Sequence, residues 1–128
     1  MIFFQDGGRQ VITSSLVGLA NTLRGYEDMK KAADILYLLA TYSVRSGFLD
    51  KASAYAEVGI RLFPRDQRLL EIHIYLLVLC RHYAEAEQAL AATRLSSRNL
   101  EYLRSRVAML TSQPQSVVQA CLRRYLAA

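Results

Sequence analysis

The sequence predicts an all-α protein built from consecutive helical hairpins, and three observations lead to this class. Small residues recur at Ala52, Ala56 and Gly59, four and then three positions apart. This spacing places them on one face of a helix, where a neighbouring helix can approach closely. The small position returns at Ala86 and again at Ala120, at two equal steps along the chain. No segment shows the convincing alternation of apolar and polar residues that is typical of a half-buried strand.

The segment around Ala52 resembles the tetratricopeptide repeat, a helical hairpin with a period of about 34 residues, which is the step that separates the three alanines. The matching residues are Leu36, Leu39, Gly47, Leu49, Ala52, Ala56, Gly59 and Pro64. The chain departs from the repeat at Ala40 and Ser43. Arg81 and Gln115 stand in place of the turn glycine in the two following units. The resemblance implies an α-α superhelix of about three degenerate hairpins, preceded by an N-terminal helix.

We expect a flexible tail over residues 1–8, followed by a single repeat domain over residues 9–128. The expected helices span residues 10–24, 27–45, 49–63, 67–80, 83–94, 100–110 and 114–126. The first of them is expected to cap the array or to add a half-unit, since terminal units of repeat proteins are atypical. Asp66 is expected to cap the helix that begins at residue 67, and Pro114 suits the first turn of the last helix. The helix over residues 67–80 is apolar nearly all round, which predicts a central place in the fold.

Composition and charge argue against several classes of protein. With 128 residues, 52% of them hydrophobic, one domain is expected, and part of its apolar surface is expected to meet a partner. The net charge of +5 comes from scattered Lys and Arg residues, so no nucleic-acid site is expected. No signal peptide and no membrane-spanning run is visible, which favours an intracellular protein. Cys80 and Cys121 are expected to be buried free thiols.

The sequence contains no constellation typical of a catalytic or metal site. His73 and His82 are nine residues apart, and neither has a Cys, Asp or Glu at metal-ligand spacing. Gly7 and Gly8 belong to no phosphate-binding motif. We therefore expect no catalytic residue, no metal and no cofactor, and we do not expect an enzyme.

In the tetratricopeptide repeat, five positions on the first helix of each hairpin line a concave groove. Carried onto this chain, they are Asp34, Tyr37, Thr41, Val44 and Arg45 in the first unit, Arg68, Glu71, Tyr75, Val78 and Leu79 in the second, and Tyr102, Ser105, Met109, Ser112 and Gln113 in the third. Tyrosine and methionine offer large contact area with adaptable packing, which suits recognition of an amphipathic helix. Core packing is an equal alternative for Val78 and Leu79. Only Arg45 and Arg68 are basic here, so a clamp for a terminal carboxylate is not expected.

The size of the chain, its turn at Gly47 and its closing Pro64 resemble the small tetratricopeptide-like chaperones of bacterial type III secretion systems. The resemblance implies a bacterial cytoplasmic chaperone that covers an amphipathic helix of a needle subunit or another early export component. It also implies a heterodimer with that client, a second small co-chaperone, and self-association of the protein alone. The alternative is a general tetratricopeptide-type interaction scaffold unrelated to secretion. A scaffold is expected to be stable alone and to bind short peptides weakly.

Overall fold

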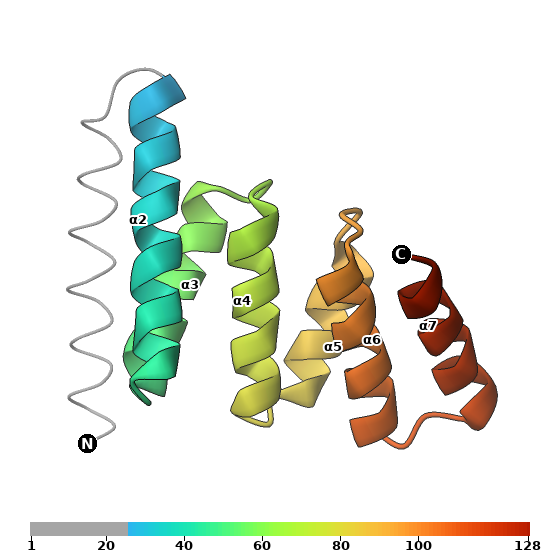
Figure 1. Cartoon of the computed structure of the whole chain (residues 1–128). Coiled ribbons are helices and arrows are strands. Elements are labelled where there is room, and N and C mark those ends of the chain that lie inside the picture. Colours follow the sequence, from blue (N-terminus) through green and yellow to red (C-terminus); the bar gives the residue numbers. More distant parts are fainter. Residues whose placement is uncertain (1–25) are drawn as a thin grey trace. The chain divides into compact units, whose positions relative to one another are not determined.

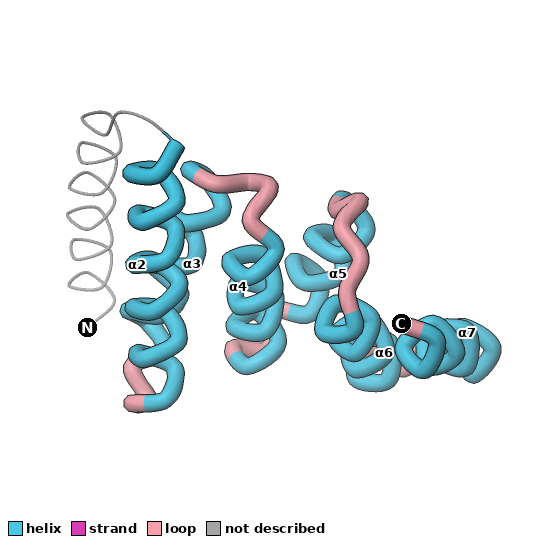
Figure 2. The backbone as a smooth tube through the Cα atoms, turned by 45° about the horizontal axis from the view of Figure 1, so that its top comes forward, coloured by secondary structure: helices cyan, strands magenta, loops and turns pink. Residues whose placement is uncertain are grey.

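The computed structural model describes residues 26–128, and every regular element in that range is an α-helix (Figure 1). The helices are α2 (Tyr26–Arg45), α3 (Leu49–Leu62), α4 (Gln67–Leu79), α5 (Tyr83–Ala92), α6 (Arg98–Leu110) and α7 (Gln115–Ala127). Figure 2 shows that only turns and short loops join them. The all-α class is therefore confirmed for the described residues. The expected tail over residues 1–8 and the expected helix over residues 10–24 lie outside this range.

The chain divides into two compact units, and the boundary falls inside α4. The first unit ends at His73, and the second runs from Ile74 to Ala128. In the first unit α2 packs along α3, and in the second α6 packs against both α5 and α7 (Figure 1). Each unit has buried side chains of its own.

The core of the first unit forms where α2, α3 and the start of α4 meet. Its centre is a cluster of buried side chains from these three helices, namely Ala33, Leu36, Val58 and Leu69. The row of small residues on α3 is buried as its spacing predicted, with Ala52 and Ala56 fully covered. At Gly59 the approach is closest, because an added Cβ would lie only 2.8 Å from Leu69 Cδ2. The small residue at this position therefore makes room for Leu69.

Helices α2, α4 and α6 end in the same backbone turn. A residue with positive φ follows each helix, and these residues are Gly47 at 81°, Arg81 at 63° and Ser112 at 55°. The next amide then donates a hydrogen bond to the carbonyl five residues back: Phe48 to Ser43 at 2.9 Å, His82 to Leu77 at 2.8 Å, and Gln113 to Ala108 at 3.0 Å. This is the hydrogen-bond pattern of a Schellman helix end, which usually places glycine at the positive-φ position.

The third turn comes three residues earlier than the predicted period places it. The step from Arg81 to Ser112 is shorter by three than the step from Gly47 to Arg81. The cause is local: α5 is four residues shorter than α3, and the loop over residues 93–97 is one residue longer than the loop over residues 63–66. The expectation that Gln115 holds the place of the third turn glycine is therefore wrong, and Ala120 is out of step with Ala52.

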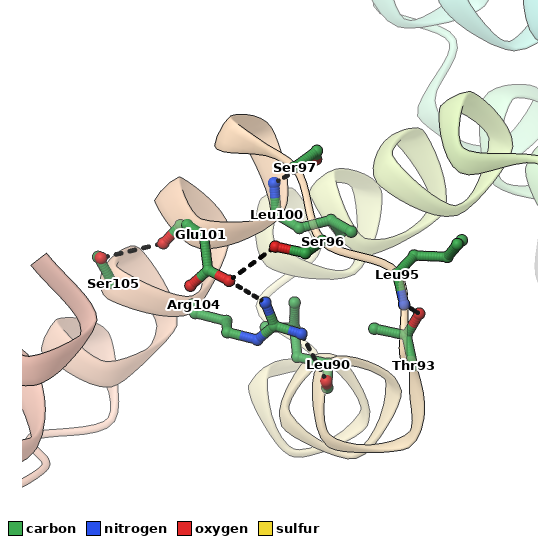
Figure 3. A network of polar contacts seen from close by, with 9 residues as sticks. All are labelled: Leu90, Thr93, Leu95, Ser96, Ser97, Leu100, Glu101, Arg104 and Ser105. Carbon is green, nitrogen blue, oxygen red and sulfur yellow. Dashed lines mark hydrogen bonds and ion pairs between the residues drawn. The ribbon is translucent and has the colours of Figure 1, made fainter. Parts of the chain in front are cut away.

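A polar network fastens α5 to α6 in the second unit (Figure 3). The Arg104 guanidinium donates to Glu101 Oε1 at 2.6 Å and to the Leu90 carbonyl at 3.2 Å. Leu90 lies in the last turn of α5, where a cation favourably offsets the free carbonyls and the helix dipole. Ser97 caps α6 by accepting a hydrogen bond from the Leu100 amide at 3.1 Å. Since Glu101 is itself buried, this charge pair sits largely out of water.

Three local expectations have clear outcomes. The Asp66 cap is confirmed, because its carboxylate accepts a hydrogen bond from the Leu69 amide at 3.2 Å. Cys121 is buried as expected, but the same expectation for Cys80 is wrong. Since α4 ends at Leu79, Cys80 falls in the exposed turn instead of the helix.

Candidate functional site

The shared turn gives a structural register for α2, α4 and α6. The residues that stand at five equivalent positions before the turn residue of each helix define a set that we call the open face. It consists of Asp34, Tyr37, Thr41, Val44 and Arg45 on α2, of Arg68, Glu71, Tyr75, Val78 and Leu79 on α4, and of Asn99, Tyr102, Arg106, Met109 and Leu110 on α6. None of these side chains is buried. On α2 and α4 the set is the one that the sequence predicted.

On α6 the sequence prediction needs correction. Tyr102 and Met109 remain on the open face, but Ser105 is almost fully buried and donates a hydrogen bond to the Glu101 carbonyl at 3.0 Å. Arg106 and Leu110 are exposed at the matching positions and were missed. Register counted from the helix end, which the break before Pro114 marks in the sequence, would have found them. Register counted from the small residues did not, because α5 is short.

In the first unit the open face is organised by Arg68. Its guanidinium donates to Asp34 Oδ1 at 2.7 Å and to Asp66 Oδ2 at 3.2 Å. The same group stands over the Tyr37 ring, with its carbon 5.1 Å from the ring centroid. The two predicted site residues Tyr37 and Arg68 are thus brought together across α2 and α4, although they are far apart in the sequence.

The charge on Arg68 is strongly maintained. Its pKa is raised above the ordinary arginine value, first by the hydrogen bond to Asp34 and then by the one to Asp66, while partial burial acts in the opposite direction. Because nearly half of each partner's side chain in the Arg68–Asp34 pair is exposed, the pair contributes no more than about 1 kcal/mol to stability. The cluster therefore acts as a positioned cation with an aromatic neighbour.

The other open-face residues of the first unit are mostly half-buried. Val44 is half-buried, and the Thr41 hydroxyl oxygen is buried with no hydrogen bond inside the described residues. Arg45 is exposed near the end of the helix. Glu71, which follows Arg68 by three residues on α4, is half-buried. The open face of the first unit thus combines the ion pair of Arg68 and Asp34 with the aromatic ring of Tyr37 and the apolar side chain of Val44.

In the second unit the open face is rich in exposed large apolar side chains. Tyr75, Leu79, Tyr102, Met109 and Leu110 are each between 38% and 48% exposed. Of the two residues for which core packing was an equal alternative, Leu79 is exposed and Val78 is half-buried. Such side chains suit contact with another apolar surface, because covering them removes apolar area from water.

Tyr102 also has a contact that the sequence did not indicate. Its ring lies 5.9 Å from the Tyr125 ring on α7, tilted by 58°. The guanidinium carbon of Arg98 stands 5.2 Å from the centroid of the Tyr125 ring. Tyr102 is thereby held against a ring that Arg98 also contacts, while about half of the Tyr102 side chain stays exposed.

A second apolar surface on α2 was missed altogether. Ile35, Leu38 and Tyr42, which we call the outer row, are exposed, and Leu39 beside them is exposed by 37%. Their spacing of three and four residues follows one side of the helix. Leu39 is among the residues that match the repeat, but residues 35, 38 and 42 are not, so their helical spacing went unused.

The described residues contain no group of three or more His, Cys, Asp or Glu side chains that could hold a metal ion. None of the helices α2 to α7 combines the length and apolarity needed to cross a bilayer. Comparisons of the chain with protein-family models, with curated proteins and with solved structures found no match.

Proposed function

We propose that the protein binds an amphipathic helix of another protein on its open face. The observation that carries this proposal is the recurrence of exposed apolar side chains at the same distances before the turn. Val78 and Leu79 on α4 correspond to Met109 and Leu110 on α6, and three of these four are exposed. Repeated presentation of apolar side chains, with no member buried, is costly in water unless a partner covers them.

The chemistry of these side chains favours a helix as the ligand. Tyr102 and Met109 are seven residues apart, which is two helical turns, so they lie on the same side of α6 with Arg106 between them. An amphipathic helix offers its own apolar strip at the same spacing and satisfies its backbone hydrogen bonds internally. Because these side chains are already about half covered, burying the rest of each one is worth about 1 kcal/mol before the cost of ordering the ligand.

We further propose that the hairpins stack as a tetratricopeptide-like superhelix and that the client is a component of a type III secretion system. The first part is supported by the shared turn of α2, α4 and α6 and by the contact between Asp34 and Arg68, which are one repeat period apart. The second part is supported by the resemblance in size and motif. In this role the protein is a cytoplasmic chaperone that keeps the client soluble and unassembled until export.

Helix binding is tested with a fluorescein-labelled synthetic peptide of about 18 residues that carries leucine at helical spacing, measured by fluorescence anisotropy. We expect Tyr102→Ser and Met109→Ser each to weaken binding by about tenfold, since each removes a large apolar contact. The matched control is Leu126→Ser, a change of an exposed apolar residue on α7 that lies off the open face. Equal binding by all four proteins, or equal binding of a scrambled peptide, would refute the proposal.

The secretion role needs a separate test. The protein is co-expressed with needle-subunit proteins of type III secretion systems, and the purified material is analysed by size exclusion with light scattering. A 1:1 complex that Met109→Ser disrupts is expected. A protein that binds the synthetic peptide but co-purifies with none of these clients would instead be a general interaction scaffold.

A further inference from the structure

Helix α2 has more apolar surface than the described residues of its own unit cover. Ala33, Leu36 and Ala40 face the core and are almost fully buried. The outer row points nearly the opposite way, because at about 100° per residue the centre of residues 35, 38 and 42 lies about 160° round the helix from the centre of the core positions. Ile35 is 52% exposed, Leu38 64% and Tyr42 74%. Three large apolar side chains in one line at this exposure form a continuous strip along two turns.

The strip continues into charged residues at both ends. Going along the same side of α2, the residues are Asp28, Lys31, Ile35, Leu38, Tyr42 and Arg45. The steps between them alternate between three and four, which is the spacing of the core positions in a coiled coil. Lys31 and Arg45 are exposed and Asp28 is half-buried. We call these six residues the α2 seam. It spans about 26 Å at about 1.5 Å per residue.

We propose that the α2 seam pairs, antiparallel, with the α2 seam of a second copy of this chain. In an antiparallel pair, facing residues have numbers that add to a constant, and the constant that matches the seam is 73. Ile35 then faces Leu38 of the second copy, and the two-fold axis repeats this contact. Lys31 faces Tyr42 of the second copy, where its ammonium can lie over the ring. Asp28 faces Arg45 of the second copy, which forms an ion pair at each end.

Charge selects this arrangement over the alternatives. A parallel pair would set Lys31 against Lys31 and Arg45 against Arg45. An antiparallel pair centred on Leu38 would set Lys31 against Arg45. Both place like charges opposite each other, which disfavours them. Only the register that centres the pair between residues 36 and 37 satisfies both the apolar and the charged positions, so the seam is complementary to itself.

The seam is short, so the dimer is expected to be of moderate affinity. Two helices in contact over about 26 Å bury less area than a standard protein interface of about 1,600 Å². We therefore expect a dissociation constant on the order of 10 μM, in the range of weak and transient complexes. The protein should be a monomer at low concentration and a dimer at high concentration.

The full-length chain is studied by sedimentation equilibrium from about 1 to 300 μM, a range that brackets the expected constant. Leu38→Asp should raise the dissociation constant more than about a hundredfold, because it removes one apolar contact from each copy. Leu126→Asp is the matched control, since it introduces the same charge at an exposed leucine outside the seam. It should leave the constant unchanged within about threefold.

A charge exchange identifies the register. Arg45→Asp and Asp28→Arg should each weaken the dimer at least about tenfold, since each sets like charges opposite at both ends. The double variant Asp28→Arg with Arg45→Asp should return to within about threefold of the parent. Circular dichroism checks that each variant is folded. A parent chain that stays monomeric at the highest concentration overturns the proposal. So does a Leu38→Asp protein that still dimerises, or a double variant that is no better than the single ones.

Discussion

The contact between Gly59 and Leu69 allows a sharp test of how closely α3 and α4 pack. In the change Gly59→Ala, helix propensity alone predicts a gain of about 1 kcal/mol in the free energy of unfolding. The added Cβ, however, would lie 2.8 Å from Leu69 Cδ2 and 3.1 Å from Cδ1. Leu69 is completely buried among Ala33, Leu36 and Val58, so it has no free space to enter. Overpacking of this kind costs about 1–3 kcal/mol.

We therefore expect Gly59→Ala to destabilise the protein by about 1 kcal/mol, as the overpacking cost exceeds the gain in propensity. Leu69→Ala should cost about 2–5 kcal/mol, because it leaves a cavity at the centre of the first unit. In that background the methyl group at residue 59 meets empty space. Gly59→Ala should then stabilise by about 1–2 kcal/mol, from propensity and partial filling of the cavity.

The assay is denaturation of the four proteins by urea, followed by far-UV circular dichroism and fitted by linear extrapolation. The double-mutant cycle should give a coupling of about 2–3 kcal/mol between the two positions. Unchanged slopes of the free energy against urea would show that the comparison is valid. If Gly59→Ala is equally stabilising in both backgrounds, with coupling below about 0.5 kcal/mol, the close approach of α3 and α4 is not a packing constraint.

Four further outcomes follow from other positions in the described residues. Gly47→Ala should destabilise by about 1 kcal/mol, although its Cβ would meet no atom within 4 Å, because the cost is the positive φ alone. Arg81→Gly should stabilise by a few tenths of a kcal/mol, because glycine adopts positive φ without strain but gains entropy in the unfolded chain. Urea denaturation measures the change in the free energy of unfolding for both variants. Arg104→Met should cost about 3 kcal/mol by leaving Glu101 buried without its cation, and adding Glu101→Gln should recover most of the loss in the same assay. The raised pKa of Arg68 adds stability that is fully present below the pKa of arginine in the unfolded chain and is lost only as the pH rises through the folded-state pKa. Arg68→Gln should therefore lower the stability equally at pH 6 and pH 9. Thermal melts at these two pH values check this.

Much of the helical layout follows from local sequence. Asp66 and Pro64 mark the start of α4 by capping and by breaking the preceding helix, and these effects act within a few residues. Gly47 likewise marks the end of α2, since glycine adopts positive φ without strain. The second and third turns use Arg81 and Ser112 instead. Propensity alone does not identify these turns, and only the hydrogen bonds of the shared turn show that they are equivalent.

The register of α6 shows why a helix end predicts the positions of exposed residues better than a repeat period does. The predicted period rests on Ala52, Ala86 and Ala120, but alanine is common in helices and two spacings can agree by coincidence. The length of α5 decides the true spacing, and nothing in a pattern of small residues measures it. A prediction that starts from the break before Pro114 has the correct register, because the end of α6 is fixed by its own backbone.

The two faces proposed for α2 share one residue, and this gives a last prediction. Tyr37 and Leu38, like Thr41 and Tyr42, are successive residues, so the open face and the outer row lie about 100° apart and can be covered together. Arg45 belongs to both the open face and the α2 seam, since it ends the open face and pairs with Asp28 of the second copy in the proposed dimer. A bound helix that engages Arg45 should therefore weaken the dimer, by about twofold to tenfold for the ion pairs lost.

Linkage requires the reverse effect of the same size: the synthetic peptide should bind the monomer more tightly than the dimer. Sedimentation of the protein with and without saturating labelled peptide measures one side of this coupling. Anisotropy at low and at high protein concentration measures the other. Arg45→Gln should remove the coupling, because Arg45 is the one α2 residue that the open face and the α2 seam share. If peptide binding and dimerisation do not affect each other in the parent chain, Arg45 takes part in only one of the two interfaces.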